Sequence, residues 1–163
     1  MYYKVVMTGG ISLLNRHNLF GELTRDKGFF EFEGTNPISK SNQSEEEINN
    51  WLSEMRNYFY KVKDCQKKIS AEYSMIHALN ENKKLSEKPE IILIHTDTFG
   101  GKAAAYLNKE IIEREFGAKV KLEEIKELDV SDRIKLNHSL GDFMSLINKH
   151  LSEKLYTAPF KDI

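Results

Sequence analysis

The stretch that decides the fold is "EIILIHTDTFGGKAAAYLNKEIIEREFG", residues 90–117. It opens with "EIILIHT" (90–96), whose four consecutive apolar side chains predict a central parallel strand buried on both faces. The residues "GKAAAYLNKEIIEREFG" (101–117) predict a helix, and Gly117 suits its C-terminal end. Small hydroxyl-bearing residues and glycines separate the two. We therefore expect a strand, a tight loop and a helix, which is the repeating unit of an α/β fold.

The beginning of the chain repeats this arrangement. "YKVVMT" (3–8) predicts a buried strand, the residues "TGGISLLN" follow it, and a short helix is expected over 16–25. Near the other end, "AKVKLEEI" (118–125) alternates like a strand with one solvent-facing side, and residues 139–155 predict a last helix. Strands and helices alternate along the chain. The expected fold is α/β with a mainly parallel central sheet.

The middle of the chain predicts helix. Ser44 and Glu47 form an S-x-x-E capping box at the start of a long helical pattern. Apolar residues then recur every three or four positions over 44–82, and only Gln66 breaks the row. This pattern predicts one long amphipathic helix, or two with a small kink. The segment before it, residues 27–43, is expected to be irregular, with a brief extended piece at "FFEF".

Size and composition bound the class of protein. The chain has 163 residues with 40% hydrophobic content, which suits a single domain spanning residues 1–163. The net charge of −1 provides no field that attracts a DNA or RNA duplex or a membrane surface. Cys65 is the single cysteine and the histidines are scattered, so we expect no disulfide, metal or cofactor. No apolar run approaches the ~20 residues that span a bilayer, and no signal peptide is evident, so a cytoplasmic location is expected.

Two similar loops form the candidate site. "TGGISLLN" (8–15) and "HTDTFGGK" (95–102) each follow a predicted strand and precede a helix. In open parallel sheets, ligands bind beyond the carboxyl ends of the strands, where the strand order reverses. Backbone N–H groups and hydroxyls in such loops suit phosphate oxygens. Lys102 adds a positive charge in a first helical turn, where the helix dipole disfavours it unless an anion is near.

A structural role is the alternative for each loop. Strand-to-helix turns use Gly, Ser, Thr and Asp for capping anyway, so either loop alone is more often a turn than a site. The two together, with Lys102, favour an anion site. Neither loop is a P-loop, and neither carries a dinucleotide-binding fingerprint.

Other candidate residues carry weaker signals. His95 and Asp97 are close in sequence, but they are more often an edge histidine and a capping aspartate than an acid–base pair. His17 follows the first loop and either points into the crevice or faces solvent. Ser70 and Glu72 are expected on the polar face of the long helix. Three aspartates near the last turn are expected to be solvated: Asp129, Asp132 and Asp142.

Several segments together resemble a known family. A first strand running into "TGGISLLN", then "AEYSMIHAL", "IILIHTDTFGGKAAAYL" and "KVKLEEIKELDV", resembles the CARF family, the Rossmann-fold sensor domains associated with CRISPR, over roughly residues 3–155. The resemblance implies that the α/β fold is a Rossmann-like three-layer sandwich with a mainly parallel central sheet. It also implies a homodimer that binds a cyclic oligoadenylate, the messenger of type III CRISPR complexes, across its two-fold axis. It implies a ligand site made of two loops: Thr8, Gly9, Gly10, Ser12, Leu13, Asn15, Thr96, Asp97, Thr98, Gly100, Gly101 and Lys102.

The resemblance leaves the activity open. The leading expectation is a non-catalytic sensor in antiviral defence, with cyclic tetra-adenylate as the leading ligand. The alternative is a stand-alone ring nuclease that cleaves the messenger without metal. Such relatives use a serine or lysine in the loops and a lysine in a later glycine-rich stretch. Here "TAPFKDI" (157–163) has Lys161 but no glycine, which weakens that alternative.

Two further expectations concern partners. Most members of the CARF family are fused to an effector or a membrane segment, and this chain holds neither. Either the sensor acts alone or that part is missing, so contact with a membrane is expected only through a segment not present in this chain. A doubly wound domain that binds an unrelated nucleotide, or serves as a scaffold, is a third class.

Overall fold

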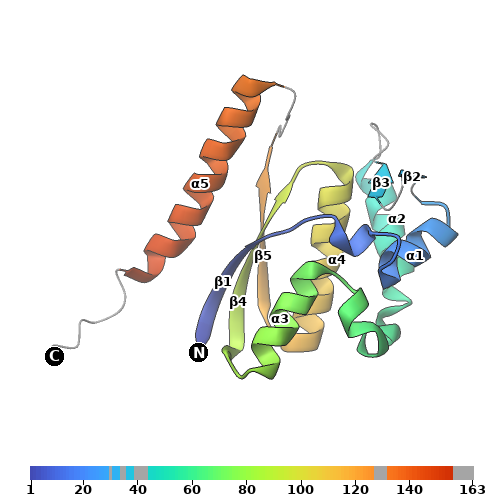
Figure 1. Cartoon of the computed structure of the whole chain (residues 1–163), viewed down its shortest axis with the longest axis horizontal. Coiled ribbons are helices and arrows are strands. Elements are labelled where there is room, and N and C mark those ends of the chain that lie inside the picture. Colours follow the sequence, from blue (N-terminus) through green and yellow to red (C-terminus); the bar gives the residue numbers. More distant parts are fainter. Residues whose placement is uncertain (30, 34–35, 39–43, 127–131, 156–163) are drawn as a thin grey trace.

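The computed structural model of the protein describes residues 1–29, 31–33, 36–38, 44–126 and 132–155. They form three layers, with a parallel sheet between helix α5 on one side and helices α3 and α4 on the other (Figure 1). The bounds of these helices are Ala71–Glu81 for α3, Phe99–Phe116 for α4 and Arg133–Leu155 for α5. The α/β, Rossmann-like fold class predicted from the sequence is confirmed.

The sheet has three parallel strands in the order β1-β4-β5. Their bounds are Tyr2–Thr8, Leu85–Thr96 and Lys119–Ile125. The middle strand, β4, begins five positions earlier than predicted, and its residues Ile91, Ile92 and Leu93 are fully buried. The prediction of a central strand covered on both faces is therefore confirmed. Thr8 pairs with Ile94, so β1 and β4 end side by side.

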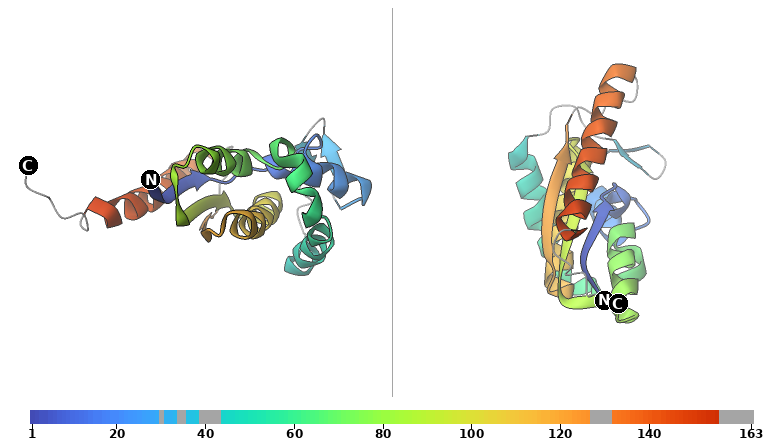
Figure 2. Two further views of the ribbon diagram at one scale, coloured as in Figure 1. Left: turned by 90° about the horizontal axis from the view of Figure 1, so that it is seen from below. Right: turned by 90° about the vertical axis from the view of Figure 1, so that its left-hand side faces the viewer.

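Helices cover the two faces of the sheet unequally. On one face, Ile91 and Leu93 of β4 pack against Ile76 of α3 and Ile112 of α4. On the other face, α5 is the covering helix, and it lies in front of the strands and runs roughly along them when viewed from its own side (Figure 2). Among the three described strands, the order runs in one direction and does not reverse. The crevice was predicted at a point where the strand order reverses, and no such point is found among these three strands. The two loops nevertheless begin at the ends of neighbouring strands, β1 and β4.

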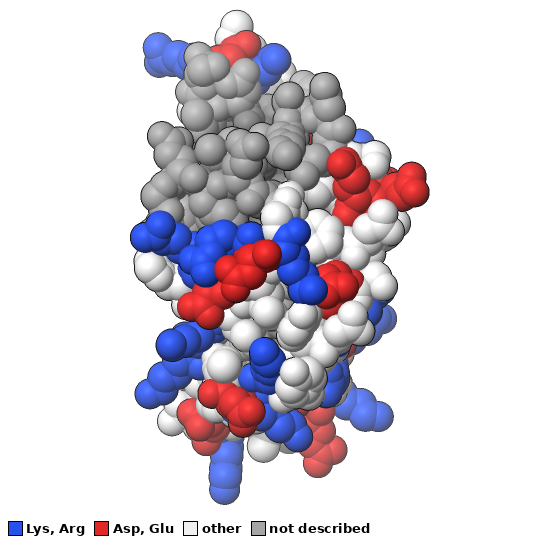
Figure 3. Space-filling view, turned by 90° about the vertical axis from the view of Figure 1, so that its right-hand side faces the viewer, with Lys and Arg blue, Asp and Glu red and all other residues white. Residues whose placement is uncertain are grey.

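A second core lies beside α4. Helices α1 (Leu19–Asp26) and α2 (Glu45–Arg56) pack there around Trp51, whose Nε1 donates to the Thr24 hydroxyl at 2.9 Å. Strands β2 (Glu31–Glu33) and β3 (Asn36–Ile38) form an antiparallel hairpin in the segment predicted to be irregular. On the side of the molecule away from α5, acidic and basic side chains are mixed rather than separated into patches (Figure 3).

The long helix predicted over 44–82 is wrong as a single helix. Its start is correct, because Ser44 and Glu47 form the predicted capping box. However, α2 ends at Arg56, and short 3-10 segments separate it from α3. Ser70 then begins a new helix, because its hydroxyl accepts from the N–H of Tyr73 at 3.0 Å. The chain thereby turns from the second core to the sheet, which a small kink would not allow.

Two other helix starts differ from prediction. Helix α1 begins at Leu19 rather than at residue 16, because a 3-10 turn over Ser12–Leu14 comes first. Helix α5 begins at Arg133 rather than at residue 139. Asp132, expected to be solvated, accepts from the N–H groups of the helix's first turn and so caps α5. Gly117 ends α4 in the left-handed conformation, as predicted.

In the part of the chain that the structure describes, no helix combines the length and apolar character needed to cross a membrane. Asp129 and Lys161 lie outside the described residues.

Candidate functional site

The first loop is attached to α3 by its own polar groups. The N–H of Gly9 continues the sheet by donating to the Ile94 carbonyl at 2.7 Å. The N–H of Gly10 donates to Glu72 Oε1 at 2.6 Å, and the Ser12 hydroxyl donates to Glu72 Oε2 at 2.9 Å. The same hydroxyl accepts from the N–H of Ala71 at 3.0 Å. Three of the donors that the sequence suggested for a phosphate, the N–H groups of Gly9 and Gly10 and the Ser12 hydroxyl, thus have partners inside the protein.

The rest of the first loop divides between core and surface. Leu13 is fully buried in the second core. Asn15 holds a local turn, because its side-chain oxygen accepts from the N–H of His17 at 3.1 Å. His17 itself is exposed, and so is Thr8, at the end of β1. Thr8 therefore offers this loop's exposed hydroxyl at the carboxyl edge of the sheet.

The second loop caps α4. The Thr98 hydroxyl accepts from the N–H of Gly101 at 3.2 Å and lies 2.9 Å from the Thr96 hydroxyl. The N–H of Asp97 donates to the Ile125 carbonyl at 3.1 Å, which ties the loop to β5. Gly100 and Gly101 are buried at the helix start. The capping role that the sequence left as an alternative is therefore present, whether or not the loop also binds a ligand.

Lys102 has a counter-ion within the chain. Its Nζ lies 3.3 Å from Glu124 Oε2, and both side chains are about one-quarter exposed. The hydrogen bond to Glu124 raises the pKa of Lys102 above its ordinary value. Because this carboxylate offsets the unfavourable position of a lysine at a helix start, that position by itself does not require a bound anion.

A cavity of about 200 Å³ joins the two loops beneath α5. Thr8 and Gly9 of the first loop and Thr96 of the second loop contribute to its wall. The remaining wall is largely apolar and comes from the sheet and from α5: Ile94, His95, Ile125, Ser139, Leu140 and Phe143. The structure thus brings three of the predicted residues together around one hollow. The other predicted residues lie in the same two loops but are not among those that line it.

The contacts of His95 explain its position without an acid–base pair with Asp97. His95 is buried, and its Nδ1 lies 2.9 Å from the carbonyl oxygen of Thr96. Since a carbonyl only accepts, this nitrogen carries the proton. The ring also packs edge-on against Tyr106 at 6.3 Å between centroids. These contacts give His95 a role in the packing of β4 against α4.

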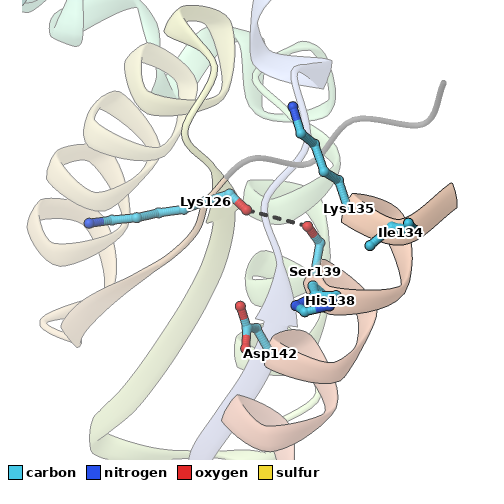
Figure 4. Close-up of a pocket in the computed structure, with 6 residues that line it drawn as sticks. All are labelled: Lys126, Ile134, Lys135, His138, Ser139 and Asp142. Atoms are coloured by element: carbon cyan, nitrogen blue, oxygen red, sulfur yellow. Dashed lines mark hydrogen bonds between the residues drawn. The ribbon is translucent and has the colours of Figure 1, made fainter. Parts of the chain in front are cut away.

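A larger hollow of about 360 Å³ lies between the end of β5 and the start of α5 (Figure 4). It is lined by Lys126, Ile134, Lys135, His138, Ser139 and Asp142. The side chains of Lys126 and Lys135 extend in different directions, so their amines do not converge on one point (Figure 4). Its described lining includes no residue of either loop. We therefore favour the smaller cavity as the functional site.

Glu72 was not predicted as a residue of the site, because its position in the sequence indicated only a polar helix face. Glu72 is 4% exposed, and Asn108 of α4, which donates to it, is fully buried. The wall contributed by Leu140 and Phe143 was missed as well. Within the described residues, no group of three or more His, Cys, Asp or Glu side chains is arranged to hold a metal ion.

Together, the fold and the paired loops define a Rossmann-like α/β domain with a hollow at the carboxyl ends of two neighbouring strands. A family model described as CRISPR-associated protein (Cas_APE2256) matches residues 67–159, which is more than half of the chain. The chain belongs to this CRISPR-associated family. The match includes the second loop and α5, and the first loop lies before it. No curated protein matches the chain.

Proposed function

We propose that this chain is a sensor domain that binds a cyclic oligoadenylate across the two-fold axis of a homodimer, in type III CRISPR antiviral defence. Membership of a CRISPR-associated family supports the setting, and the resemblance to CARF domains supports the ligand. The observation that carries the proposal is the cavity of about 200 Å³ in which the two candidate loops meet.

The cavity suits part of a nucleotide. Its apolar wall, with Phe143 and Leu140 on one side and Ile94 on the other, is suited to a flat heteroaromatic base. At its rim, the exposed Thr8 hydroxyl can donate to a phosphate or ribose oxygen. An apolar hollow with a few polar groups at its edge is typical of sites that take small organic ligands.

Calorimetry with cyclic tri-, tetra- and hexa-adenylate tests the proposal. We expect cyclic tetra-adenylate to bind most tightly. Thr8→Val keeps the shape of the side chain but removes the hydroxyl, and it should weaken binding about tenfold to a hundredfold, as expected for one hydrogen bond lost in each of the two chains that share the ring. Ser53→Ala, on an exposed position of α2, is the matched control and should bind as the wild type does. Failure of all three rings to bind the wild-type protein would overturn the proposal.

We propose that the domain binds the ring without cleaving it. A metal-independent ring nuclease needs a serine or lysine that faces the ring, and the Ser12 hydroxyl is engaged by Glu72 and Ala71. Lys102 is likewise paired with Glu124. Overnight incubation of a labelled ring with excess protein and EDTA separates the two activities. A ring that stays intact while bound supports the sensor, and a linear product with a cyclic 2′,3′-phosphate end would support the nuclease.

A further inference from the structure

The feature that the proposed function leaves unused is the buried carboxylate beneath the first loop. We propose that Glu72 is a positioning residue of the ligand site, which holds the first loop in the conformation that receives the ring. This inference rests on the proposed function and adds a residue that does not line the cavity.

The contacts between the first loop and α3 are reciprocal. The Ser12 hydroxyl accepts from the N–H of Ala71, the first residue of α3, while Glu72 in the same helical turn accepts from the N–H of Gly10. In an ordinary capping box, such an exchange joins residues three positions apart. Here Ser12 and Glu72 are 60 positions apart. The exchange therefore fastens a loop to a distant helix instead of starting a helix locally.

The hydrogen bonds around Glu72 continue into α4 and form one buried network. Asn108 Nδ2 lies 3.4 Å from Glu72 Oε2, and the Ser70 hydroxyl donates to Asn108 Oδ1 at 2.7 Å. Ser70, Glu72 and Asn108 are all at least 96% buried. Asn108 belongs to α4, the helix whose first turn contains Gly101 and Lys102. The network thus connects the first loop to the helix that carries the second loop.

The chemistry of Glu72 argues for a role in loop conformation. Its partners among the described residues are neutral donors: the N–H of Gly10, the hydroxyl of Ser12 and the amide of Asn108. A buried carboxylate is costly unless such donors surround it, and two of the three come from the first loop. Loop and carboxylate therefore depend on each other. A loop that moved away would leave the carboxylate without most of its partners.

This arrangement also decides which groups of the loop face a ligand. The N–H of Gly10 and the hydroxyl of Ser12 are directed at Glu72, in the interior. The cavity is lined instead by Thr8 and Gly9, immediately before them. The position of Thr8 and Gly9 is thus fixed on one side by β1 and on the other by the contact of Gly10 with Glu72.

Glu72→Ala and Glu72→Gln test the inference, with Ser74→Ala as the matched control. Ser74 lies on the same helix, and its hydroxyl donates to the backbone carbonyl of Ser70 and not to Glu72, to Asn108 or to the first loop. Binding of cyclic tetra-adenylate is measured by calorimetry at a temperature where circular dichroism shows each variant to be folded. We expect Glu72→Ala to weaken binding about tenfold or more. Glu72→Gln, which keeps an acceptor for Gly10, should lose less, and Ser74→Ala should bind as the wild type does.

Hydrogen exchange of the Gly10 amide gives a readout that does not depend on the ring. It should speed up in Glu72→Ala, while amides in β4 keep their wild-type protection. If the wild-type protein binds no ring, the proposed function fails, and this measurement still shows whether Glu72 fixes the loop. Wild-type affinity in folded Glu72→Ala would overturn the inference. So would tighter binding, because Glu72 would then compete with the ring for the loop's donors.

Discussion

Gly101 lies where the first turn of α4 meets the end of β4. A Cβ at this position would collide with the Thr96 hydroxyl and lie 2.8 Å from the Thr96 carbonyl oxygen. A carbonyl of the strand cannot give way as a flexible side chain can, so Gly101→Ala should lower the free energy of unfolding by about 1–3 kcal/mol. Urea unfolding measures the loss. The glycine is thus explained by packing between the helix and its own loop.

Gly141 is the matched control for Gly101. It lies inside α5, and apart from the adjacent residues and the helix's own backbone no heavy atom is within 4 Å of the Cβ that alanine would add. Alanine is preferred over glycine in a helix, so Gly141→Ala should raise the free energy of unfolding by about 0.5–1 kcal/mol. A similar loss of stability in both variants would contradict the explanation by packing.

Substitutions of Lys102 and of its ion-pair partner Glu124 should change ligand binding in different directions. If Lys102 contacts a ring phosphate, Lys102→Ala weakens binding of cyclic tetra-adenylate, whereas Glu124→Gln frees the lysine and leaves binding equal or tighter. We expect this opposite behaviour in calorimetry. The cost in stability should stay below about 1 kcal/mol for either variant, because the pair is partly exposed. If Lys102→Ala binds the ring with wild-type affinity, Lys102 serves only its ion pair with Glu124 and does not contact the ring.

At the scale of helices and strands, the sequence predicts what local interactions determine. The capping box of Ser44 and Glu47 and the left-handed Gly117 involve neighbours in sequence, and both are confirmed. The break between α2 and α3 is different. Both helices carry the same apolar spacing, but α2 packs around Trp51 while α3 packs on the sheet. Periodicity alone cannot show that one apolar row serves two separate cores.

The site was predictable to the same extent. The alternation of strands and helices placed both loops at the carboxyl edge of one sheet, and the structure brings Thr8, Gly9 and Thr96 together. What each loop touches was not predictable, because the partners are distant in sequence. Glu72 follows the helix-starting Ser70 and resembles any acidic residue in a first turn, which gives no sign that it binds Gly10.

Helix α5 is attached to the sheet partly through Glu123 of β5, which gives a prediction about pH. Hydrogen bonds from Lys121 and from buried His150 lower the pKa of Glu123 below its ordinary value of 4.5. A carboxylate with a lowered pKa contributes stability above the unfolded-state value, and this contribution is lost as the pH falls through the folded-state value. Glu123→Gln should therefore be less stable than the wild type at neutral pH.

Urea unfolding between pH 7 and pH 3 measures this effect. The difference between the wild type and Glu123→Gln should narrow below about pH 4.5, as the wild-type carboxylate takes up its proton. Glu87→Gln, at an exposed position of β4 for which no interaction is found among the described residues, should follow the wild-type curve. A constant difference across the whole range would show that Glu123 acts through shape and not through charge.

For the whole molecule, α5 has two structural roles. Phe143 packs on the sheet as part of the core, and with Leu140 it also closes the cavity above the two loops. Leu140 remains half-exposed, as do Met144 and Leu151 on the same side of the helix. The covering layer of the sheet is therefore also a wall of the proposed site, so ligand binding and the docking of α5 should stabilise each other.

The proposed symmetry gives a prediction of stoichiometry. A ring held across a two-fold axis contacts two identical chains, so titration of cyclic tetra-adenylate should end at one ring per two chains. Light scattering should give a complex of twice the 18.9 kDa chain mass, plus the ring. Cyclic tri-adenylate has no two-fold axis and cannot offer the same surface to both chains, so it should bind more weakly. An end point of one tetra-adenylate ring per chain would exclude the shared site while leaving the binding function in place.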